Sequence, residues 1–360
     1  MQHMRKAIKV LIVDDSAMIR EFLRSALDAE PDIRVVGTAS DPYFARDKLK
    51  SLTPDVITLD IEMPRMDGLT FLTKLMAARP LPVVIFSKVT QKGAEATLRA
   101  LRLGAVEVVS KPTSNLHERL PELRQEIVSK VRAAARARLT RLDQRGPDPA
   151  GLEAAPLSLA FSPTPSMVVV MGASTGGTVA LEQVLCSLPA DSPPIAVVQH
   201  LPAQFTGPFA VRLDQNAAIK VAEAADYQPL DPGQALIAPG GRHLILALGQ
   251  HGYYVRVKDG PLVNHHRPSV DVLFRSAAAN AGAEAVGVIM TGMGSDGAQG
   301  AREMRQAGGL IVAQDEASSV IYGMARAVVE SGQAGQVLPL GRIGGLLTGL
   351  WTQAQRGGRP

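Results

Sequence analysis

Residues 10–20 read VLIVDDSAMIR, an apolar strand that ends in two aspartates and leads into a helix. Further apolar runs follow in the first third of the chain, each short and rich in Val and Ile, as buried parallel strands are. Helical patterns separate these runs, so the stretch predicts a doubly wound α/β fold with a five-stranded parallel sheet. The predicted strands are Ile8–Val13, Arg34–Ala39, Val56–Leu59, Val83–Phe86 and Val106–Val109.

A change in composition divides the chain. A helix that starts near Leu116 is predicted to continue to about Leu142, because Ala and Arg favour helices. Residues 144–166, QRGPDPAGLEAAPLSLAFSPTPS, are rich in Pro, Gly and Ser and are predicted to be a linker. The expected division is a first domain over 1–125, a helical extension and linker over 126–166, a second domain over 167–352 and a flexible tail over 353–360.

The second domain repeats the α/β pattern on a larger scale. It opens with an uninterrupted apolar strand, Met167–Met171, and a hairpin is predicted over residues 243–257. Alternating strands and helices again predict a doubly wound, mostly parallel sheet. The further predicted strands are Ile195–Gln199, Leu236–Ala238, Ala285–Met290 and Leu310–Ala313.

The composition restricts the class of protein. With 46% hydrophobic and 20% charged residues, the chain has an ordinary globular composition, and no apolar run approaches the roughly 18 residues that span a bilayer. The single cysteine, Cys186, excludes an intrachain disulfide and a cysteine-based zinc site and fits a reducing cytosol. The first residues lack a signal-peptide cleavage site, so we expect a cytoplasmic protein. The net charge of +4 is too small to indicate a nucleic-acid partner.

Charged residues gather where the strands of the first domain end. Asp14 and Asp15 end the first strand, Asp60 ends the third and Lys111 ends the fifth. The carboxyl ends of parallel strands meet at one edge of a sheet, which is where such folds bind ligands. Three carboxylates there repel one another unless a cation intervenes, and Mg²⁺ is expected because it takes oxygen ligands. A carboxylate beside Mg²⁺ can accept a phosphoryl group, to which Ser87 can donate a hydrogen bond.

A simpler interpretation is that Asp14 and Asp15 cap the following helix. The first third nevertheless resembles the receiver domain of two-component response regulators in four motifs, VLIVDDSAMIR, ITLDIEMPRMDGL, VVIFSKVT and EVVSKP, between Lys6 and about Leu123. The resemblance implies a flavodoxin-like fold and phosphorylation that depends on Mg²⁺. It implies that Asp60 is the phosphoacceptor, that Asp14, Asp15, Asp60 and the Glu62 backbone carbonyl form the metal site, and that Ser87 and Lys111 contact the phosphoryl group.

A Gly-rich turn, MGASTGGTVAL at residues 171–181, joins the first strand of the second domain to a helix. A dinucleotide site requires G-x-G-x-x-G and an acidic residue after the following strand, where this chain has His200. A P-loop requires a lysine that the turn lacks. The remaining interpretation is that Ser174 is a nucleophile at a helix N-terminus, where backbone N–H groups can stabilise an oxyanion.

A serine nucleophile needs a base and a group that orients the base. His200 and Asp296 each follow a predicted strand, so both are expected at the same sheet edge as Ser174. The order Ser, His, Asp differs from that of α/β-hydrolases, in which the acid precedes the histidine. The alternatives are a capping serine, a solvated histidine and an aspartate that stabilises a turn.

The other histidines compete less well for a role. His243 follows the motif APGGR and can line the same cleft. His265 and His266 are adjacent, and adjacent side chains are not expected to face one site. We therefore predict no metal there, and no metal or organic cofactor in the second domain.

The second domain resembles the catalytic domain of the chemotaxis protein-glutamate methylesterases, in the motifs GASTGG, QHLP, APGGRH, HRPSVDVLF and MTGMGSDG. The resemblance covers about Met167 to Leu350. It implies a serine hydrolase that removes methyl esters from glutamates of methyl-accepting chemotaxis receptors and that also deamidates receptor glutamines. It implies a chemotaxis histidine kinase as phosphodonor, and we expect a monomer. It assigns catalytic roles to Ser174, His200 and Asp296, and places Thr175 and Met293 near the oxyanion.

The order of the two domains predicts an output controlled by phosphorylation. We expect the unphosphorylated receiver to cover the catalytic cleft and phosphorylation of Asp60 to release it. Lys88 replaces the small residue more usual after Ser87, and with the Arg-rich linker it leaves the details of regulation open. Two alternatives remain: an adaptor that binds a partner through the basic stretch Lys130–Arg145, and an esterase that serves another signalling array.

Overall fold

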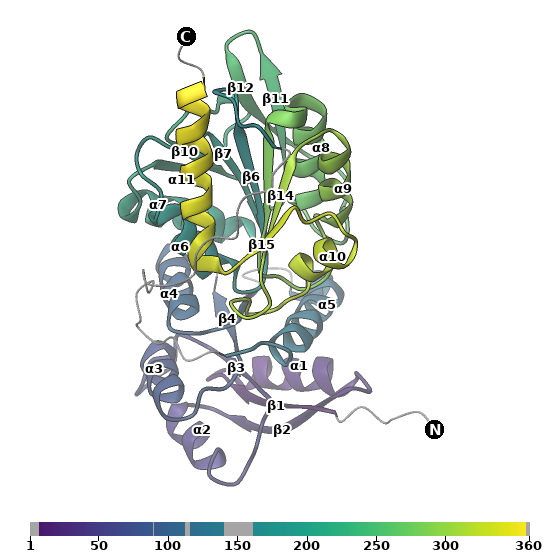
Figure 1. Ribbon diagram of the computed structural model, residues 1–360. Helices are drawn as coiled ribbons and strands as arrows, with labels where there is room; N and C mark the ends of the chain where they lie inside the picture. Colours follow the sequence, from purple (N-terminus) through teal and green to yellow (C-terminus); the bar gives the residue numbers. More distant parts are fainter. Residues whose placement is uncertain (1–6, 89, 112–115, 140–160, 358–360) are drawn as a thin grey trace. The chain divides into compact units, whose positions relative to one another are not determined.

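The computed structural model describes residues 7–88, 90–111, 116–139 and 161–357 (Figure 1). The chain divides into two compact units, Met1–Leu142 and Asp143–Pro360, and each has an α/β structure. The division falls within residues 126–166, where the sequence predicts an extension and a linker. Among the described residues, no helix combines the length and the apolar character needed to cross a membrane.

The first unit is built on one parallel sheet in the order β2-β1-β3-β4-β5, which confirms the predicted five-stranded fold. β1 lies between β2 and β3 and buries its apolar side chains, which is why its sequence is continuously apolar. The strands are β1 (Ile8–Val13), β2 (Ile33–Ala39), β3 (Val56–Leu59), β4 (Val83–Lys88) and β5 (Glu107–Lys111). The helices are α1 (Ala17–Asp28), α2 (Pro42–Lys48), α3 (Gly68–Ala78), α4 (Gln91–Arg102) and α5 (Leu116–Ala134).

Side-chain caps mark the starts of four of these helices. At α1 the cap is Ser16, whose Oγ accepts a hydrogen bond from the Ile19 N–H. Neither Asp14 nor Asp15 therefore occupies the capping position, so capping does not explain why acids follow β1. The other side-chain caps are Asp41 at α2, Asp67 at α3 and Thr90 at α4.

The prediction that the last helix of this unit runs to about Leu142 was too long. α5 ends at Ala134, and residues 140–142 lie outside the described part of the chain. Most helical stability in proteins comes from packing an apolar face, and the buried face of α5, with Ile127 and Val131, ends at Ala134. Helix propensity alone therefore overestimated the length.

The second unit contains a sheet of seven parallel strands in the order β15-β14-β13-β6-β7-β10-β8. Residues between β8 and β13 in the chain also form a three-stranded antiparallel sheet in the order β11-β12-β9, which contains the predicted hairpin. The parallel strands are β6 (Val168–Ala173), β7 (Ile195–Gln199), β8 (Lys220–Glu223), β10 (Gln234–Ile237), β13 (Ala285–Ile289), β14 (Leu310–Gln314) and β15 (Gln336–Leu338). The antiparallel strands are β9 (Gln228–Pro229), β11 (His243–Gly249) and β12 (Gly252–Lys258).

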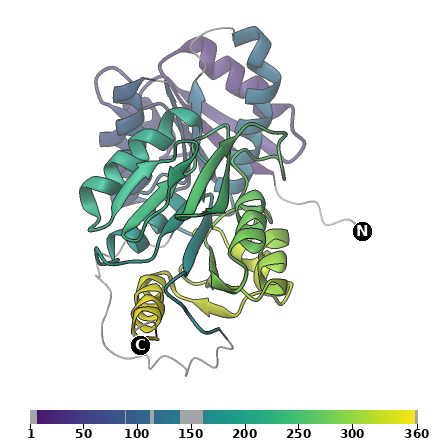
Figure 2. The same cartoon turned by 90° about the horizontal axis from the view of Figure 1, so that it is seen from above.

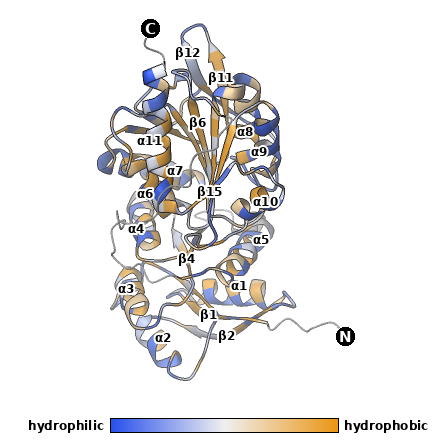
Figure 3. Cartoon of the chain, in the orientation of Figure 1, coloured by the Kyte–Doolittle hydropathy of each residue, from blue (hydrophilic) through white to orange (hydrophobic). Residues whose placement is uncertain are grey.

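Helices cover both faces of the seven-stranded sheet, as a doubly wound fold requires (Figure 2). Figure 3 shows apolar residues concentrated in the strands and polar residues on the outer sides of the helices. One layer consists of α6 (Gly177–Cys186), α7 (Ala203–Asn216) and α11 (Leu340–Gly357), and the other of α8 (Val270–Asn280), α9 (Ala298–Gln306) and α10 (Met324–Glu330). A short 3₁₀ helix, η1 (Gly282–Glu284), precedes β13.

The predicted flexible tail over 353–360 is wrong for residues 353–357, because α11 continues to Gly357. Ala354 is fully buried, and the Trp351 indole N–H donates to Asp191 Oδ1 at 2.8 Å, so packing holds this last turn in place. The sequence prediction also missed β8, β9 and β15, which have two to four residues each and include exposed positions that hide an apolar pattern.

Candidate functional site

The acidic residues of the first unit meet at one edge of its sheet, as predicted. Asp14 follows β1, Asp60 follows β3 and Lys111 ends β5, and all three side chains are buried. The Lys111 Nζ lies 2.7 Å from Asp14 Oδ2 and 2.6 Å from Asp60 Oδ2. Ser87, at the end of β4, is buried at the same edge.

The electrostatics of this edge favour a cation. Desolvation raises the pKa of Asp60 to about 6 and also raises that of Asp14, although Lys111 opposes both shifts. Asp15 is exposed, and ligand oxygens of Asp14, Asp15 and Asp60 lie within 4.8 Å of one another. Two buried carboxylates and an exposed one offer only oxygen ligands, which fit Mg²⁺.

The loop after β3 holds Asp60 in place. The Glu62 N–H donates to Asp60 Oδ1 at 3.3 Å, and the Gly68 N–H donates to the Ile61 carbonyl at 2.8 Å. A Cβ atom on Gly68 would lie 2.2 Å from the Asp60 carbonyl oxygen, so the chain requires glycine where this loop returns to α3.

The second site is built on the turn between β6 and α6. Gly176 has φ of 77°, and a Cβ atom there would also collide with Val320, so glycine makes this tight turn possible. The Ser174 N–H donates to the Thr291 carbonyl at 3.0 Å, and the Ser174 carbonyl accepts from Gln199 Nε2 at 2.9 Å. These bonds from neighbouring strands fix the backbone of Ser174 at the carboxyl edge of the sheet.

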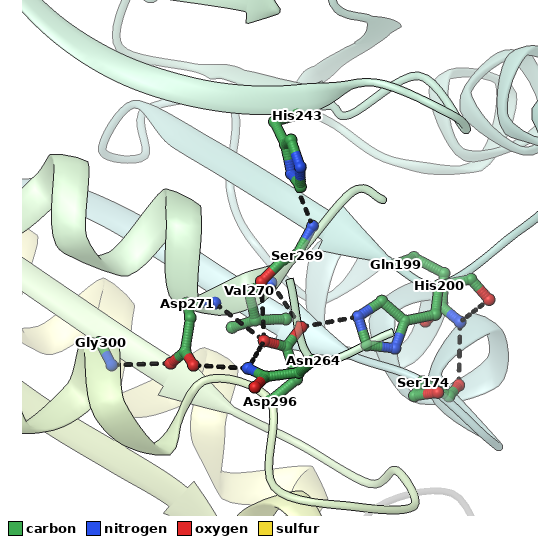
Figure 4. A network of polar contacts seen from close by, with 10 residues as sticks. All are labelled: Ser174, Gln199, His200, His243, Asn264, Ser269, Val270, Asp271, Asp296 and Gly300. Carbon is green, nitrogen blue, oxygen red and sulfur yellow. Dashed lines mark hydrogen bonds and ion pairs between the residues drawn. The ribbon is translucent and has the colours of Figure 1, made fainter. Parts of the chain in front are cut away.

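His200 and Asp296 form a buried pair beside this turn. His200 Nε2 lies 2.9 Å from Asp296 Oδ2, and the two side chains are 7% and 1% exposed (Figure 4). Burial alone would raise the pKa of Asp296. Hydrogen bonds from His200, Asn264 and Ser269 lower it by more than burial raises it, so the pKa lies below its usual range. Asp296 is therefore an ionised acceptor near neutral pH.

The charge of Asp296 fixes the tautomer of His200. An ionised carboxylate only accepts hydrogen bonds, so a neutral His200 must carry its proton on Nε2. The other ring nitrogen, Nδ1, is buried and has no hydrogen-bond partner among the described residues. In Figure 4 the ring lies between Asp296 and Ser174, so the lone pair of Nδ1 is available for a proton from the serine side.

Two family models match the chain, namely the response regulator receiver domain over residues 10–121 and the CheB methylesterase over residues 169–347. Protein-glutamate methylesterase/protein-glutamine glutaminase 5 of Anaeromyxobacter dehalogenans is 53% identical over 344 residues, which cover 94% of this chain and 95% of that protein. Protein-glutamate methylesterase/protein-glutamine glutaminase 3 of Geobacter metallireducens is 51% identical over 349 residues, 94% of this chain and 97% of that protein. The chain belongs to the CheB methylesterase family.

Structural similarity agrees with this family membership. The CheB methylesterase catalytic domain of Thermotoga maritima is 38% identical, has a TM-score of 0.50, and matches 51% of this chain and 98% of its own length. Both resemblances stated from sequence motifs are thus confirmed. The chain is a methylesterase of the chemotaxis type that carries a response regulator receiver domain.

In this CheB methylesterase, Thr175 directly follows Ser174, and Met293 belongs to a loop whose Gly292 lies against Ser174. The Thr175 carbonyl accepts from Thr291 Oγ1 at 2.9 Å, which anchors the residue after the serine. Met293 follows Gly292, and a Cβ atom on Gly292 would lie 2.8 Å from Ser174 Cβ. The Ser174 N–H is already bonded to the Thr291 carbonyl, so it is not available as an oxyanion donor.

The sequence reasoning missed three residues that surround the pair in this CheB methylesterase. Asn264 Nδ2 and Ser269 Oγ donate to Asp296 Oδ1 at 2.8 and 2.7 Å, and the His266 ring stacks on His200. Sequence analysis assigned His266 no role, although its ring lies against that of His200. His266 and Ser269 belong to the motif HRPSVDVLF, which carried a resemblance but no role, and Asn264 lies outside that motif. His243 is buried and bonds the Ser269 N–H through Nδ1 at 3.3 Å.

Proposed function

We propose that this protein hydrolyses γ-methyl esters of glutamate side chains on methyl-accepting chemotaxis receptors and deamidates receptor glutamines. Two relatives that match nearly the whole chain are named protein-glutamate methylesterase/protein-glutamine glutaminase. The observation that carries the proposal is the His200–Asp296 hydrogen bond, beside which His200 Nδ1, on the side of Ser174, has no partner in the described part of the chain. This is the arrangement that a serine nucleophile needs.

The proposed reaction has two stages. Ser174 Oγ attacks the ester carbonyl carbon while its proton moves to His200 Nδ1, and the tetrahedral intermediate collapses as His200 returns that proton to the departing methanol. Water then attacks the acyl-enzyme, again giving a proton to His200, and free glutamate and Ser174 are released. With a glutamine substrate the same proton is delivered to the departing ammonia.

Charge develops at two places during this reaction, and the site has a group for each. The imidazolium of His200 is stabilised by the ionised Asp296 at 2.9 Å. The oxyanion requires N–H donors close to the reacting carbon, and we assign this role to the backbone N–H groups of Thr175 and Met293.

We assign control of the reaction to the receiver, whose partner is a histidine kinase. Mg²⁺ would be held by Asp14, Asp15, Asp60 and the Glu62 carbonyl, and when bound it neutralises charge on a phosphoryl group at Asp60. Lys111, which contacts two of these carboxylates, and Ser87 at the same edge are proposed to bond that phosphoryl group. Phosphorylation is proposed to relieve inhibition of the catalytic unit.

No observation favours the adaptor alternative. Two of the basic side chains that would contact a partner are engaged within their own unit: Arg132 Nη2 lies 2.5 Å from Asp32 Oδ1, and Lys130 Nζ lies 2.8 Å from Glu107 Oε2. Arg138 contacts another group, and Arg141 and Arg145 lie outside the described part of the chain.

Magnesium is expected to stabilise the receiver against heat. At a concentration about 100-fold above its Kd, a ligand that binds only the folded state adds about 2.7 kcal/mol, which corresponds to a rise in Tm of roughly 5 °C or more. The measurement is thermal unfolding of the full chain with and without MgCl₂. The double variant Asp14→Asn with Asp15→Asn should lose the rise, and an unchanged rise would place the metal elsewhere.

Asp60→Asn is expected to remove the response to a small phosphodonor. In the wild type, acetyl phosphate with Mg²⁺ should accelerate methanol release by roughly 5- to 150-fold, the range of a typical coupling free energy. The variant should show only its basal rate, because it has no carboxylate to phosphorylate. The control is Asp47→Asn, an exposed aspartate of the same unit. An equal response of Asp60→Asn and the wild type would contradict the assignment.

A further inference from the structure

A tight turn carries two of the residues that surround the His200–Asp296 pair. The Val263 N–H donates to the His266 carbonyl at 3.0 Å, and the His266 N–H donates to the Val263 carbonyl at 2.9 Å. The two residues between them, Asn264 and His265, have φ of 52° and 66°. Two successive left-handed residues define the turn closely, so the side chains of Asn264 and His266 are held at fixed positions.

The side chain at the start of the turn holds the carboxylate. Asn264 Nδ2 donates to Asp296 Oδ1 at 2.8 Å and to Asp271 Oδ2 at 2.6 Å. Asp271 is itself buried and accepts from the Gly300 N–H at 2.7 Å (Figure 4). Asn264 thus connects Asp296 to the start of α9 through a chain of hydrogen bonds.

The side chain at the end of the turn holds the imidazole. The rings of His266 and His200 are stacked, with their centroids 3.7 Å apart and their planes inclined by 13°. Asp296 fixes the His200 ring at its Nε2 edge, and His266 covers one of its faces. A ring that is bonded at one edge and covered on one face cannot rotate away from Ser174 without breaking one of these contacts.

We infer that His266 is a positioning residue for the esterase reaction, which holds His200 through its face and stabilises the imidazolium as it forms. The inference rests on the proposed function, because it takes His200 as the base. When His200 receives the proton of Ser174, the resulting cation lies against the face of the His266 ring, with 3.7 Å between the two ring centroids, and a cation is attracted to an aromatic face. This attraction is absent before proton transfer, so it lowers the barrier rather than tightening substrate binding.

The alternative is that His266 has only a packing role beside the site. The two accounts differ in what can replace the imidazole. If filling space is sufficient, a leucine restores activity as well as an aromatic ring does. If stacking is required, only a flat aromatic face restores the rate, because leucine provides no π-face to the imidazolium.

The test compares variants of His266 in the full chain, with release of tritiated methanol from a methylated chemoreceptor as the readout. His266→Ala and His266→Leu should each lower kcat by about tenfold while changing KM by less than about twofold. His266→Phe should recover most of kcat. The matched control is His265→Asn, which changes the neighbouring exposed histidine of the same turn to a residue that tolerates a left-handed conformation.

A second measurement separates positioning from misfolding. The proton on His200 Nε2 gives a downfield ¹H NMR signal when it bonds Asp296, and this signal should persist in His266→Phe and weaken in His266→Ala. Equal kcat for His266→Leu and His266→Phe, or a loss expressed only in KM, would overturn the inference. Ser174→Ala is measured in parallel: if that variant stays active, the proposed function has failed, whereas if it is inactive and His266→Ala matches the control, only this inference has failed.

Discussion

Replacing Ser174 with alanine is expected to lower methanol release from a methylated chemoreceptor by about 10⁴-fold or more. The size follows from the role of the residue, because removal of a serine nucleophile leaves only the oxyanion donors and substrate binding to accelerate attack by water. Stability should be unchanged, since the bonds that fix Ser174 involve its backbone N–H and carbonyl, which alanine retains.

The matched control for this variant is Ser166→Ala. Ser166 is an exposed serine just before β6, whereas Ser174 follows the same strand at its other end. The control should keep the wild-type rate and Tm. If Ser174→Ala folds normally and retains more than about a tenth of the wild-type rate, a mechanism through a serine acyl-enzyme is excluded.

Asp296→Asn is expected to cost about 10⁴-fold in kcat, the size seen when the aspartate of a serine protease triad is changed in the same way. The Asp296 carboxylate accepts hydrogen bonds from His200 Nε2, Asn264 Nδ2 and Ser269 Oγ, and also from the N–H groups of Val270 and Asp271. An asparagine amide must point an NH₂ group toward some of these donors. If that group faces His200, it donates to Nε2, which moves the ring proton to Nδ1 and blocks acceptance of the Ser174 proton.

The same change should destabilise the fold, because it leaves at least one buried donor without an acceptor. We expect a loss of about 1–3 kcal/mol, measured by urea unfolding beside the exposed control Asp259→Asn. Activity and stability are measured separately for this variant. If Asp296→Asn is folded at the assay temperature and turns over substrate at a rate near that of the control, Asp296 does not orient the base.

Both sites could be predicted from sequence because of a single geometric fact. Parallel strands end at one edge of their sheet, so residues that directly follow neighbouring strands of the same sheet are brought together. In the first unit this applies to Asp14 and Asp60, and in the second to Ser174 and His200. The strands themselves were predictable because buried parallel strands are continuous runs of Val, Ile and Leu. The positions of these residues at the edges of the sheets could therefore be predicted without knowledge of side-chain contacts.

The residues that sequence reasoning missed are placed by loops rather than by periodic elements. His266 reaches His200 because two left-handed residues turn the chain between Val263 and His266, and no hydrophobic period encodes that turn. The short strand β9 was hidden for a related reason, since its two residues are too few to show alternation. The end of α5 was misplaced because propensity says nothing about where a buried face stops.

The account as a whole is tested most directly by methanol release from a methylated chemoreceptor, with the full chain in the presence and absence of Mg²⁺ and acetyl phosphate. The account predicts release that depends on Ser174 and rises when both additions are present. Release without any response to the phosphodonor would retain the esterase and contradict control by the receiver. No release in either condition, from a folded chain that still binds the receptor, would contradict the central claim that Ser174, His200 and Asp296 hydrolyse receptor methyl esters.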